Sequence, residues 1–418
     1  MICVSSIANG TCRPMRIVFL MPTYYPDSFG GAERQTRILA RSLCERGASI
    51  TILTPTFQAQ AAGMVDEPEA RVVRLLMRND PALGGRYVFS MLHFWFRAFL
   101  WLARHRRAYD VIAIQHLRLH ALPGLIAGRL FGKLLSAKLG RGGAHIELRR
   151  LPAQKLPFGK IVVALARRSR LVFVANSREI AGDLAALGIP AKRVARVPNG
   201  VECPPEPRAA YRAPDGAPVF VYAGRLAQEK RVDRLIEAFR IFSAETPATL
   251  HIFGAGPEKA RLIAQAADLT SVRFMGVTDD RDAIYGGAAF MILPSDSEGM
   301  SNTLLEAMAY GAVPVITDVS GVGDLVLSGC SGVILADNTR EAILDGLRTA
   351  AALDPVQWAA MSAEARQRVC EEHAIDVVAE AYLRLYREMA DDRLNRAPPA
   401  LGRGIGDPGA GLPANVGP

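Results

Sequence analysis

Two glutamates stand eight positions apart in one loop-to-helix segment, and both are placed to accept hydrogen bonds. Residues 294–311 read PSDSEGMSNTLLEAMAYG and lead from a short apolar run into a helix-like run. Glu298 lies in the loop. Glu306 lies on the helix beside Leu305 and Met308, which are typical of a core, and its carboxylate can accept two adjacent hydroxyls such as those of a ribose. An isolated glutamate on an amphipathic helix would more often be an ordinary surface residue.

The start of the same helix offers free backbone amides. Ser301 or Asn302 can cap the helix with its side chain, which leaves the amides near Gly299, Met300 and Ser301 available. Amides at a helix N-terminus, together with the helix dipole, favour an anion. This loop is therefore expected to meet a phosphate or a sugar hydroxyl.

A second loop places two cations at the end of a predicted strand. The strand 219–223 is followed by Gly224 and Arg225, and Lys230 follows in the same loop. A planar guanidinium and a point-charge ammonium together suit a diphosphate, and they can offset the charge that grows on a departing nucleoside diphosphate. The alternative is a basic turn in solvent, but the glycine and the strand end favour a ligand site.

Two glycine pairs complete the set of loops. Gly30 and Gly31 follow the first predicted strand and begin a helix, so backbone there can approach an anion closely. Gly254 and Gly256 let another strand turn sharply into a helix, and this turn is expected to approach a nucleotide. Neither pair completes a Gly-x-Gly-x-x-Gly fingerprint, which argues against a nicotinamide cofactor.

Short β-branched runs alternate with longer helix-period segments, a pattern typical of α/β architectures in which helices cover parallel sheets. Because 418 residues exceed what one hydrophobic core usually serves, two such units are expected. Predicted strands cover 16–21, 49–54, 110–115, 133–137, 171–175, 219–223, 250–253, 272–275, 289–293 and 313–317, and predicted helices cover 31–46, 87–104, 120–131, 158–168, 178–186, 232–243, 257–267, 302–310 and 375–390.

A proline-rich stretch around 198–218 can continue neither a helix nor a strand and separates the two units. Met15 directly precedes the first strand, so the residues before it are treated as dispensable, and the Gly- and Pro-rich end of the chain is predicted not to fold. The expected organisation is an extension over 1–14, a Rossmann-like domain over 15–198, a linker over 199–218, a second Rossmann-like domain over 219–372, a C-terminal helix over 373–392 and a disordered tail over 393–418.

Charge is distributed unevenly between the two units. Residues 1–200 hold 30 Lys and Arg against 11 Asp and Glu, whereas residues 201–418 hold 20 against 30. This surplus favours an anionic partner for the first unit: an acidic membrane surface, a pyrophosphate-linked lipid or, less readily, a nucleic acid. The alternative is solubility alone. Six scattered cysteines without a Cys-x-x-Cys pair, and first residues that do not read as a secretory signal, favour a reducing cytosol.

From about residue 15 to 390 the chain resembles retaining glycosyltransferases of family 4, which have the GT-B fold: two doubly wound Rossmann-like domains facing across a cleft. The motifs that carry the resemblance occur in the family's order. They are Gly30-Gly31, Asn176-Ser177, Pro198-Asn199-Gly200-Val201, Gly224-Arg225 with Lys230, Gly254-Ala255-Gly256-Pro257 and the Glu298 to Glu306 segment.

The resemblance implies a role for each motif. Arg225 and Lys230 would bind the donor diphosphate in place of a metal ion, Glu306 would hold the ribose and Glu298 would meet hydroxyls of the transferred sugar, with the Gly31 amide completing the phosphate site. No cofactor or metal is expected. The resemblance further implies transfer from a UDP- or GDP-sugar to a glycan or lipid-linked acceptor, with retained anomeric configuration, in the biosynthesis of a cell-surface polysaccharide.

One position departs from the family pattern. Many relatives place a histidine just after the strand that corresponds to 133–137, and this chain has Ala137-Lys138-Leu139-Gly140 there. His145 is assigned the catalytic role in its place, with Lys138 and Glu147 as alternatives. The missing histidine keeps a second interpretation open: a catalytically silent nucleotide-sugar-binding subunit of a polysaccharide assembly complex. Intact Glu298 favours the enzyme.

The segment 87–103 is apolar on almost every side and is followed by four basic residues, 104–107. It is too short to span a bilayer, and Arg97 interrupts it. It is either a buried helix of the first domain or a helix that dips partly into a membrane face. The basic surplus is consistent with a cytoplasmic protein attached peripherally to the inner face of the cell membrane, and no nucleic acid is expected as a partner.

Overall fold

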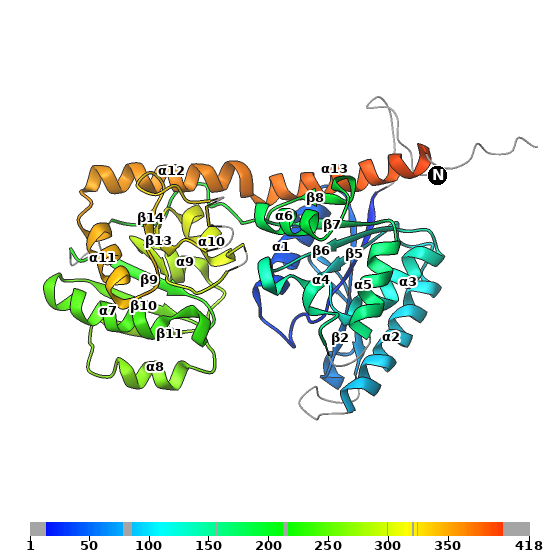
Figure 1. Cartoon of the computed structure of the whole chain (residues 1–418), viewed down its shortest axis with the longest axis horizontal. Coiled ribbons are helices and arrows are strands. Elements are labelled where there is room, and N and C mark those ends of the chain that lie inside the picture. Colours follow the sequence, from blue (N-terminus) through cyan, green and yellow to red (C-terminus); the bar gives the residue numbers. More distant parts are fainter. Residues whose placement is uncertain are drawn as a thin grey trace, which may run out of the picture.

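Two α/β domains lie side by side, and the long helices α12 (Pro355–His373) and α13 (Ile375–Asn395) run along one side of both (Figure 1). The computed structural model describes residues 14–77, 86–154, 158–211, 216–298, 300–319, 322–323 and 325–395. The predicted α/β class, with two parallel-sheet Rossmann-like domains, is confirmed.

The first domain is built on a sheet whose strands lie in the order β3-β4-β2-β1-β5-β6-β7-β8. Val, Ile and Leu side chains fill its interior, because helices cover both faces of a parallel sheet. The strands are β1 (Arg16–Leu20), β2 (Ser49–Thr56), β3 (Gly63–Glu67), β4 (Ala70–Leu76), β5 (Val111–Gln115), β6 (Leu134–Lys138), β7 (Leu171–Ala175) and β8 (Val194–Arg196), and the helices are α1 (Gly31–Glu45), α2 (Arg86–Arg104), α3 (Leu122–Leu130), α4 (Glu147–Arg150), α5 (Phe158–Arg168) and α6 (Arg178–Ala186).

The hairpin β3–β4 lies at one edge of this sheet and was absent from the predicted elements. It is the antiparallel part of the sheet. The arginines of β4 interrupt its apolar pattern, but each pairs with an acidic residue of β3: Arg71 with Asp66 at 2.8 Å and Arg74 with Glu67 at 2.5 Å. Cross-strand ion pairs thus permit a strand that the apolar pattern alone does not indicate.

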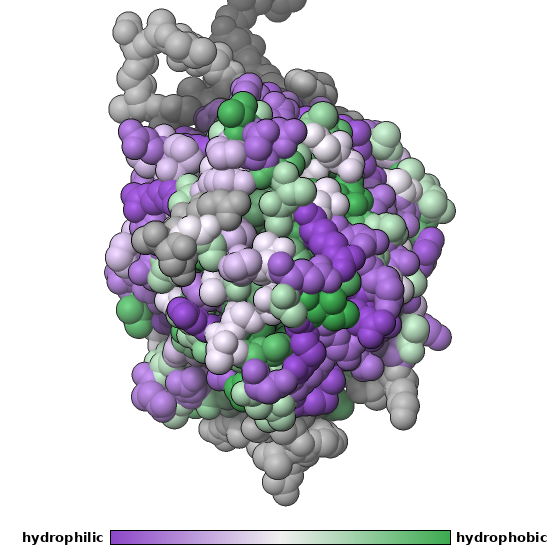
Figure 2. Space-filling model, turned by 90° about the vertical axis from the view of Figure 1, so that its left-hand side faces the viewer, coloured by the Kyte–Doolittle hydropathy of each residue, from purple (hydrophilic) through white to green (hydrophobic). Residues whose placement is uncertain are grey.

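The second domain is built on a parallel sheet in the order β11-β10-β9-β12-β13-β14. Its core lies between this sheet and the flanking helices. The strands are β9 (Val219–Ala223), β10 (Thr249–Phe253), β11 (Val272–Gly276), β12 (Phe290–Leu293), β13 (Val313–Thr317) and β14 (Val333–Leu335), and the helices are α7 (Val232–Glu245), α8 (Lys259–Gln265), α9 (Arg281–Tyr285), α10 (Asn302–Tyr310) and α11 (Arg340–Ala351). Figure 2 views the far end of this domain, where hydrophilic residues are spread among small, separate apolar areas.

The strand order reverses at one point in each sheet. β1 lies between β2 and β5, and β9 lies between β10 and β12. In open α/β sheets, ligands bind outside the carboxyl ends of the strands at such a reversal. The predicted site loops lie there: Gly30 and Gly31 follow β1, and residues 224–231 and 294–301 follow β9 and β12.

Helix α13 ends the described chain but packs on the first domain. Its Tyr382 and Tyr386 join the same buried cluster as Phe19 of β1. Tyr386 Oη lies 3.2 Å from Ser136 Oγ of β6. The helix continues to Asn395, past the predicted end at 392. Residues 396–418 of the predicted tail and 1–13 of the predicted extension lie outside the described residues.

The first residues of the predicted linker are built into the domain junction. Gln35 Nε2 of α1 donates to the Gly200 carbonyl at 2.7 Å, and the Gly200 amide donates to Gln35 Oε1 at 3.0 Å. Val201 forms a parallel bridge with Ala374, the residue between α12 and α13. These buried backbone groups need partners away from water, so they hold residues 199–201 in place rather than leaving them as a free connector.

Candidate active site

Lys230 and Glu298 form an ion pair between two loops of the second domain. Lys230 Nζ lies 2.6 Å from Glu298 Oε1, and Ser295 Oγ donates to the same oxygen at 2.7 Å. The loops are also tied by their backbones, since the Asp296 amide donates to the Glu229 carbonyl at 2.9 Å. The parallel pairing of β9 with β12 brings these distant loops together. The two predicted residues therefore belong to one charged pair.

Arg225 lies in the same loop as Lys230 and is exposed. Its backbone is fixed, because Tyr222 Oη donates to the Arg225 carbonyl at 3.0 Å. Among the residues that the structure describes, none forms an ion pair or hydrogen bond with its guanidinium. Gly224 lies between Tyr222 and Arg225, and a Cβ at Gly224 would stand 3.0 Å from the Tyr222 hydroxyl. Arg225 is therefore available to an anionic ligand beside Lys230.

The start of α10 lies against the glycine loop of the first domain. Asn302 Nδ2 donates to the Gly31 carbonyl at 3.0 Å. A Cβ at Gly31 would come within 2.7 Å of that nitrogen, and one at Gly30 would come within 2.6 Å of Glu33 Oε2. Glycine at position 31 thus lets the backbone of the first domain approach the start of α10, whereas glycine at position 30 leaves room for Glu33 of its own domain.

Ser301, rather than Asn302, caps α10. Its Oγ accepts from the Leu304 amide at 3.4 Å. Asn199 Nδ2 donates to Asn302 Oδ1 at 2.7 Å and lies 3.3 Å from the buried Met300's carbonyl. Asn302 therefore bridges the domains instead of capping the helix. The predicted ligand contact of Gly299 falls outside the described residues.

Glu306 is buried at the domain junction between two arginines. Arg34 Nε of α1 lies 3.0 Å from Glu306 Oε1, and Arg281 Nε of α9 lies 3.0 Å from Oε2. Tyr285 Oη donates to Oε2 at 3.3 Å. Burial raises the pKa of Glu306, and the two arginines oppose that effect. Neither Arg34 nor Arg281 is among the residues predicted from the sequence, although Arg34 stands one turn after Gly31.

Little space remains beside this carboxylate. The adjoining cavity has a volume of about 30 Å³ and is lined by Arg34, Gly200, Glu202, Arg281 and Tyr310, among others. A space of that size suits one or two waters. Binding of a ribose to Glu306 therefore requires the arginines to move or the two domains to separate.

Gly254 and Gly256 pack against the loop that carries Arg225. Gly254 has a φ of 145°, and a Cβ there would stand 1.9 Å from the Gly224 carbonyl oxygen. A Cβ at Gly256 would stand 2.1 Å from the carbonyl oxygen of Leu226. Both glycines therefore pack closely against the backbone of the loop that carries Arg225 and hold that loop in place.

The segment after β6, where the resemblance leads to the expectation of a histidine, contains one exposed and two buried candidates for that residue's role. His145 is exposed, in a single helical turn before α4. Glu147 is buried, and its Oε1 accepts from the Gly140 amide at 2.9 Å and lies 3.7 Å from His116 Nδ1. Lys138 is buried at the carboxyl end of β6. Glu147 therefore shapes the loop, whereas Lys138 holds a buried charge at the position where the resemblance leads to the expectation of a histidine.

Replacing Lys138 by methionine is expected to raise the free energy of unfolding by about 2 to 3 kcal/mol at pH 7. Burial lowers the pKa of Lys138 from 10.5 to about 8. The unfolded chain therefore holds its proton between pH 8 and 10.5 while the folded chain has released it, so the stability of the unmodified protein rises with pH there. The advantage of the variant should shrink over that range.

Urea unfolding at pH 7 and pH 10 measures this effect. Lys160, which is exposed on α5, provides the matched control, because its replacement by methionine removes a lysine without relieving burial. Equal stability changes for the two variants at pH 7 would contradict the expectation.

Comparison with known proteins finds one family match on each domain. Residues 29–203 match Glycosyltransferase Family 4, and residues 217–352 match Glycosyl transferases group 1. Together these matches cover well over half of the chain.

Named relatives are glycosyltransferases of several kinds. Glycogen synthase of Mycobacterium tuberculosis is 32% identical over 206 residues, which are 48% of this chain and 49% of that protein. The putative colanic acid biosynthesis glycosyltransferase WcaL of Salmonella typhimurium is 26% identical over 345 residues, or 75% of this chain and 82% of WcaL. The match to the glycogen synthase thus spans about half of that protein's length.

Solved structures share the fold. Sucrose-phosphate synthase of Thermosynechococcus elongatus has a TM-score of 0.73 at 18% identity, and Anabaena HepE in complex with UDP and glucose has 0.67 at 17%. Each alignment covers 90% of this chain and 100% of the other. The fold and the two family matches together show that the chain belongs to the GT-B glycosyltransferases of family 4, group 1.

Proposed function

We propose that this chain is a retaining glycosyltransferase that moves a sugar from a UDP- or GDP-sugar to a glycan or lipid-linked acceptor in the assembly of a cell-surface polysaccharide. The observation that carries the proposal is the Lys230–Glu298 pair at 2.6 Å, located where the strand order of the second sheet reverses. Exposed Arg225 shares its loop, and the Gly31 backbone contacts the start of α10 at the domain junction.

The chemistry follows from the charges of these residues. Arg225 and Lys230 offset the charge on the departing nucleoside diphosphate, so transfer proceeds without a divalent metal. Glu298 accepts hydrogen bonds from the sugar, whose hydroxyls replace Ser295 as its partner. The leaving diphosphate oxygen takes the proton of the acceptor hydroxyl on the same face, which retains the anomeric configuration.

The functions for which relatives are named support the substrate class. HepE is a protein whose structure holds UDP and glucose, and one curated relative of M. tuberculosis is a GDP-mannose-dependent mannosyltransferase that is 35% identical over 135 residues, 31% of this chain and 35% of that protein. WcaL is named for the biosynthesis of colanic acid, a polysaccharide. These names support both nucleotide bases and a polymeric product.

A donor panel tests the proposal directly. The full chain is incubated with UDP- and GDP-sugars in the presence of a chelator, and the release of nucleoside diphosphate is followed with and without glycan acceptors. We expect breakdown of one donor, lost in Glu298→Ala. Binding without breakdown, with Glu298→Ala no different, would instead support the silent nucleotide-sugar-binding subunit. A need for added metal would contradict the metal-independent mechanism, and inverted product stereochemistry would contradict retention.

Helix α2 supports peripheral attachment to a membrane. It buries Met91, Phe94 and Trp95 in the core. On its outer face, however, the side chain of Phe89 is 72% exposed and that of Phe96, two turns further along, is 65% exposed. No helix among the described residues is long and apolar enough to span a bilayer. Exposed aromatics on an amphipathic helix can enter the headgroup region, and the basic first domain adds attraction to anionic lipids.

Replacing both Phe89 and Phe96 by serine is expected to reduce binding to anionic vesicles by about tenfold, because the variant loses most of the apolar area that enters the bilayer. Vesicle co-sedimentation measures the effect. Val356, which is exposed on α12 of the second domain, provides the control through Val356→Ser. Unchanged co-sedimentation of the double variant would contradict a membrane role for α2.

A further inference from the structure

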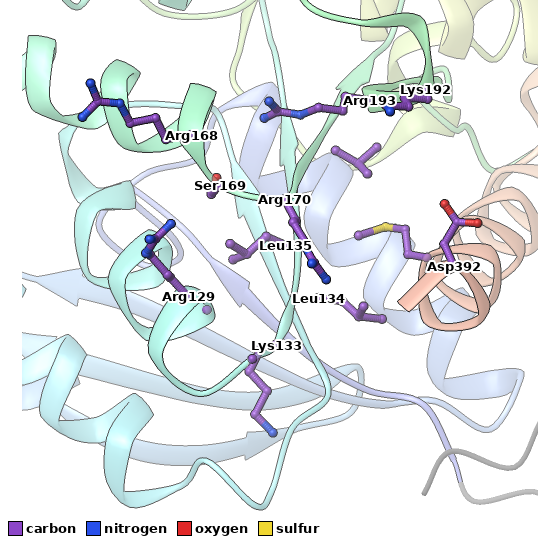
Figure 3. A pocket seen from close by; sticks show the side chains of 14 residues that line it. Arg129, Lys133, Leu134, Leu135, Arg168, Ser169, Arg170, Lys192, Arg193 and Asp392 are labelled. Carbon is purple, nitrogen blue, oxygen red and sulfur yellow. The ribbon is translucent and has the colours of Figure 1, made fainter. Parts of the chain in front are cut away.

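A pocket of about 500 Å³ opens at the amino ends of β6 and β7, on the first domain (Figure 3). Its floor is apolar and its rim is basic. The floor is formed by Leu134, Leu135, Val172 and Met389, and the basic residues that line the pocket are Arg129, Lys133, Arg168, Arg170, Lys192 and Arg193. Asp392 of α13 is the acidic residue among those lining it.

The pocket is remote from the candidate active site. Leu134 begins β6 at the pocket, and Lys138 ends the same strand on the side where the donor loops lie. Four residue steps along a strand span about 13 Å. The crossover helices α3 and α5 deliver their C-terminal ends to the pocket side, which explains why Arg129 and Arg168 gather there.

Two of the six cations are already engaged with backbone. Arg193 donates to the carbonyls of Ala166, Arg167 and Leu171, at 2.7 to 2.9 Å. Lys133 Nζ donates to the Tyr109 carbonyl at 2.8 Å.

The other four cations are Arg129, Arg168, Arg170 and Lys192. They are exposed, and they form no ion pair with any residue that the structure describes. In Figure 3 the side chain of Arg170 extends across the pocket between Arg129 and Asp392. Several like charges without carboxylate partners around one opening favour a ligand that brings negative charge.

The rest of the lining indicates which chemical groups the negatively charged ligand carries. Helices α3 and α5 end here, and the carbonyl ends of helices repel an anion from the interior. Ser169 Oγ, a polar group of the lining, already donates to the Ala166 carbonyl at 3.1 Å. A phosphate is therefore favoured at the rim, and the apolar floor requires a hydrocarbon group to displace its water. A small soluble phosphate would supply the phosphate at the rim but lacks the hydrocarbon group for the floor.

We propose that this pocket binds an anionic membrane phospholipid, with its phosphate between Arg129 and Arg170 and its first acyl carbons on Leu134, Val172 and Met389. Leu130, which follows Arg129 and is 64% exposed, extends the apolar contact next to the rim. The site is separate from the donor loops and from the exposed face of α2. It gives the basic surplus of the first domain a specific ligand rather than a diffuse attraction.

Calorimetric titration of the full chain with dihexanoyl phosphatidylglycerol, kept below its micelle concentration, tests the proposal without any membrane surface. We expect saturable binding that weakens at least tenfold in the variant Arg129→Glu/Arg170→Glu. Arg273→Glu/Arg384→Glu makes the same change of charge with exposed arginines that do not line the pocket, and it should bind like the unmodified chain. The neutral variant Arg129→Gln/Arg170→Gln should also bind at least fivefold more weakly.

Two comparison ligands separate the sources of binding. Dihexanoyl phosphatidylcholine lacks the net negative charge, and glycerol 3-phosphate lacks the acyl chains, so each should bind at least tenfold more weakly. Equal affinity for glycerol 3-phosphate would overturn the proposal in favour of a soluble phosphate site. Equal affinity for the choline lipid, or undiminished binding by both Arg129/Arg170 variants, would overturn it as well. Unchanged melting temperatures and donor breakdown would show that the variants remain folded.

Discussion

Replacing Lys230 by alanine is expected to lower the rate of sugar transfer by about 100- to 1000-fold, the loss seen when one preorganised group that stabilises developing charge is removed. Cleavage of the bond to the sugar leaves its electron pair on the diphosphate oxygen, which adds one negative charge to the departing nucleoside diphosphate. Lys230 is half-buried and held at 2.6 Å from Glu298, so its ammonium is positioned before the donor arrives. Arg225 alone would then face the diphosphate.

The variant should affect the chemical step more than the fold. Breaking the pair leaves Glu298 with Ser295 Oγ as a partner, so its carboxylate is not stranded. Single-turnover kinetics with saturating donor measure the effect, and Lys160→Ala removes an exposed lysine of the other domain as a control. A rate within threefold of the unmodified chain would show that Lys230 does not stabilise the leaving group.

Replacing Glu306 by alanine is expected to destabilise the domain junction by about 3 kcal/mol and to weaken donor binding by about tenfold. The removal of one partner from a buried ion pair leaves the other charge uncompensated, which costs about 3 to 5 kcal/mol. Here two largely buried arginines, Arg34 and Arg281, would be left side by side. We expect the lower end of that range because both retain some contact with solvent. The loss of affinity reports the proposed bond to the ribose.

Urea unfolding and donor titration measure the two effects separately. Glu306→Gln keeps the shape and the acceptor for Tyr285 but removes the charge, so it should fall between the alanine variant and the unmodified chain. Glu341→Ala is the matched control, because Glu341 is an exposed helix glutamate that pairs with its neighbour Arg340. If Glu306→Ala loses stability but binds the donor normally, the carboxylate has a structural role at the junction and the ribose contact is wrong.

Much of the fold could be predicted from the sequence because its signals are local. The strand ranges 16–21, 171–175 and 219–223 are short runs of buried β-branched and aromatic residues, and they agree with β1, β7 and β9 to within a residue. The glycines before α1 and the serine before α10 mark helix starts through rules that act within one turn. Elements whose pattern depends on a distant partner, such as the arginine-containing β4, were not found.

The residues of the candidate site also differ in whether a local sequence signal or only a tertiary contact reveals their role. Lys230 and Glu298 were singled out separately, each by its position after a strand, and the pairing of β9 with β12 makes them partners. His145 is the predicted replacement for the missing histidine, yet it is exposed, whereas the alternatives Lys138 and Glu147 are buried. Cys203 and Cys370 give a similar case: they are far apart in sequence, but the tertiary structure brings them near enough for the Cys203 thiol to lower the pKa of Cys370.

The sequence by itself determined the two-domain α/β architecture, the order of the ligand loops and the residue types that can bind a nucleotide sugar. These follow from hydrophobic periodicity, turn chemistry and side-chain charge, which act over a few residues. Only the tertiary structure decided that Glu306 is held by Arg34 and Arg281, that Asn302 bridges to Gly31, and that basic helix ends surround one apolar pocket. Such contacts depend on how separate elements pack, and the sequence pattern of each element carries no record of the partner that it meets.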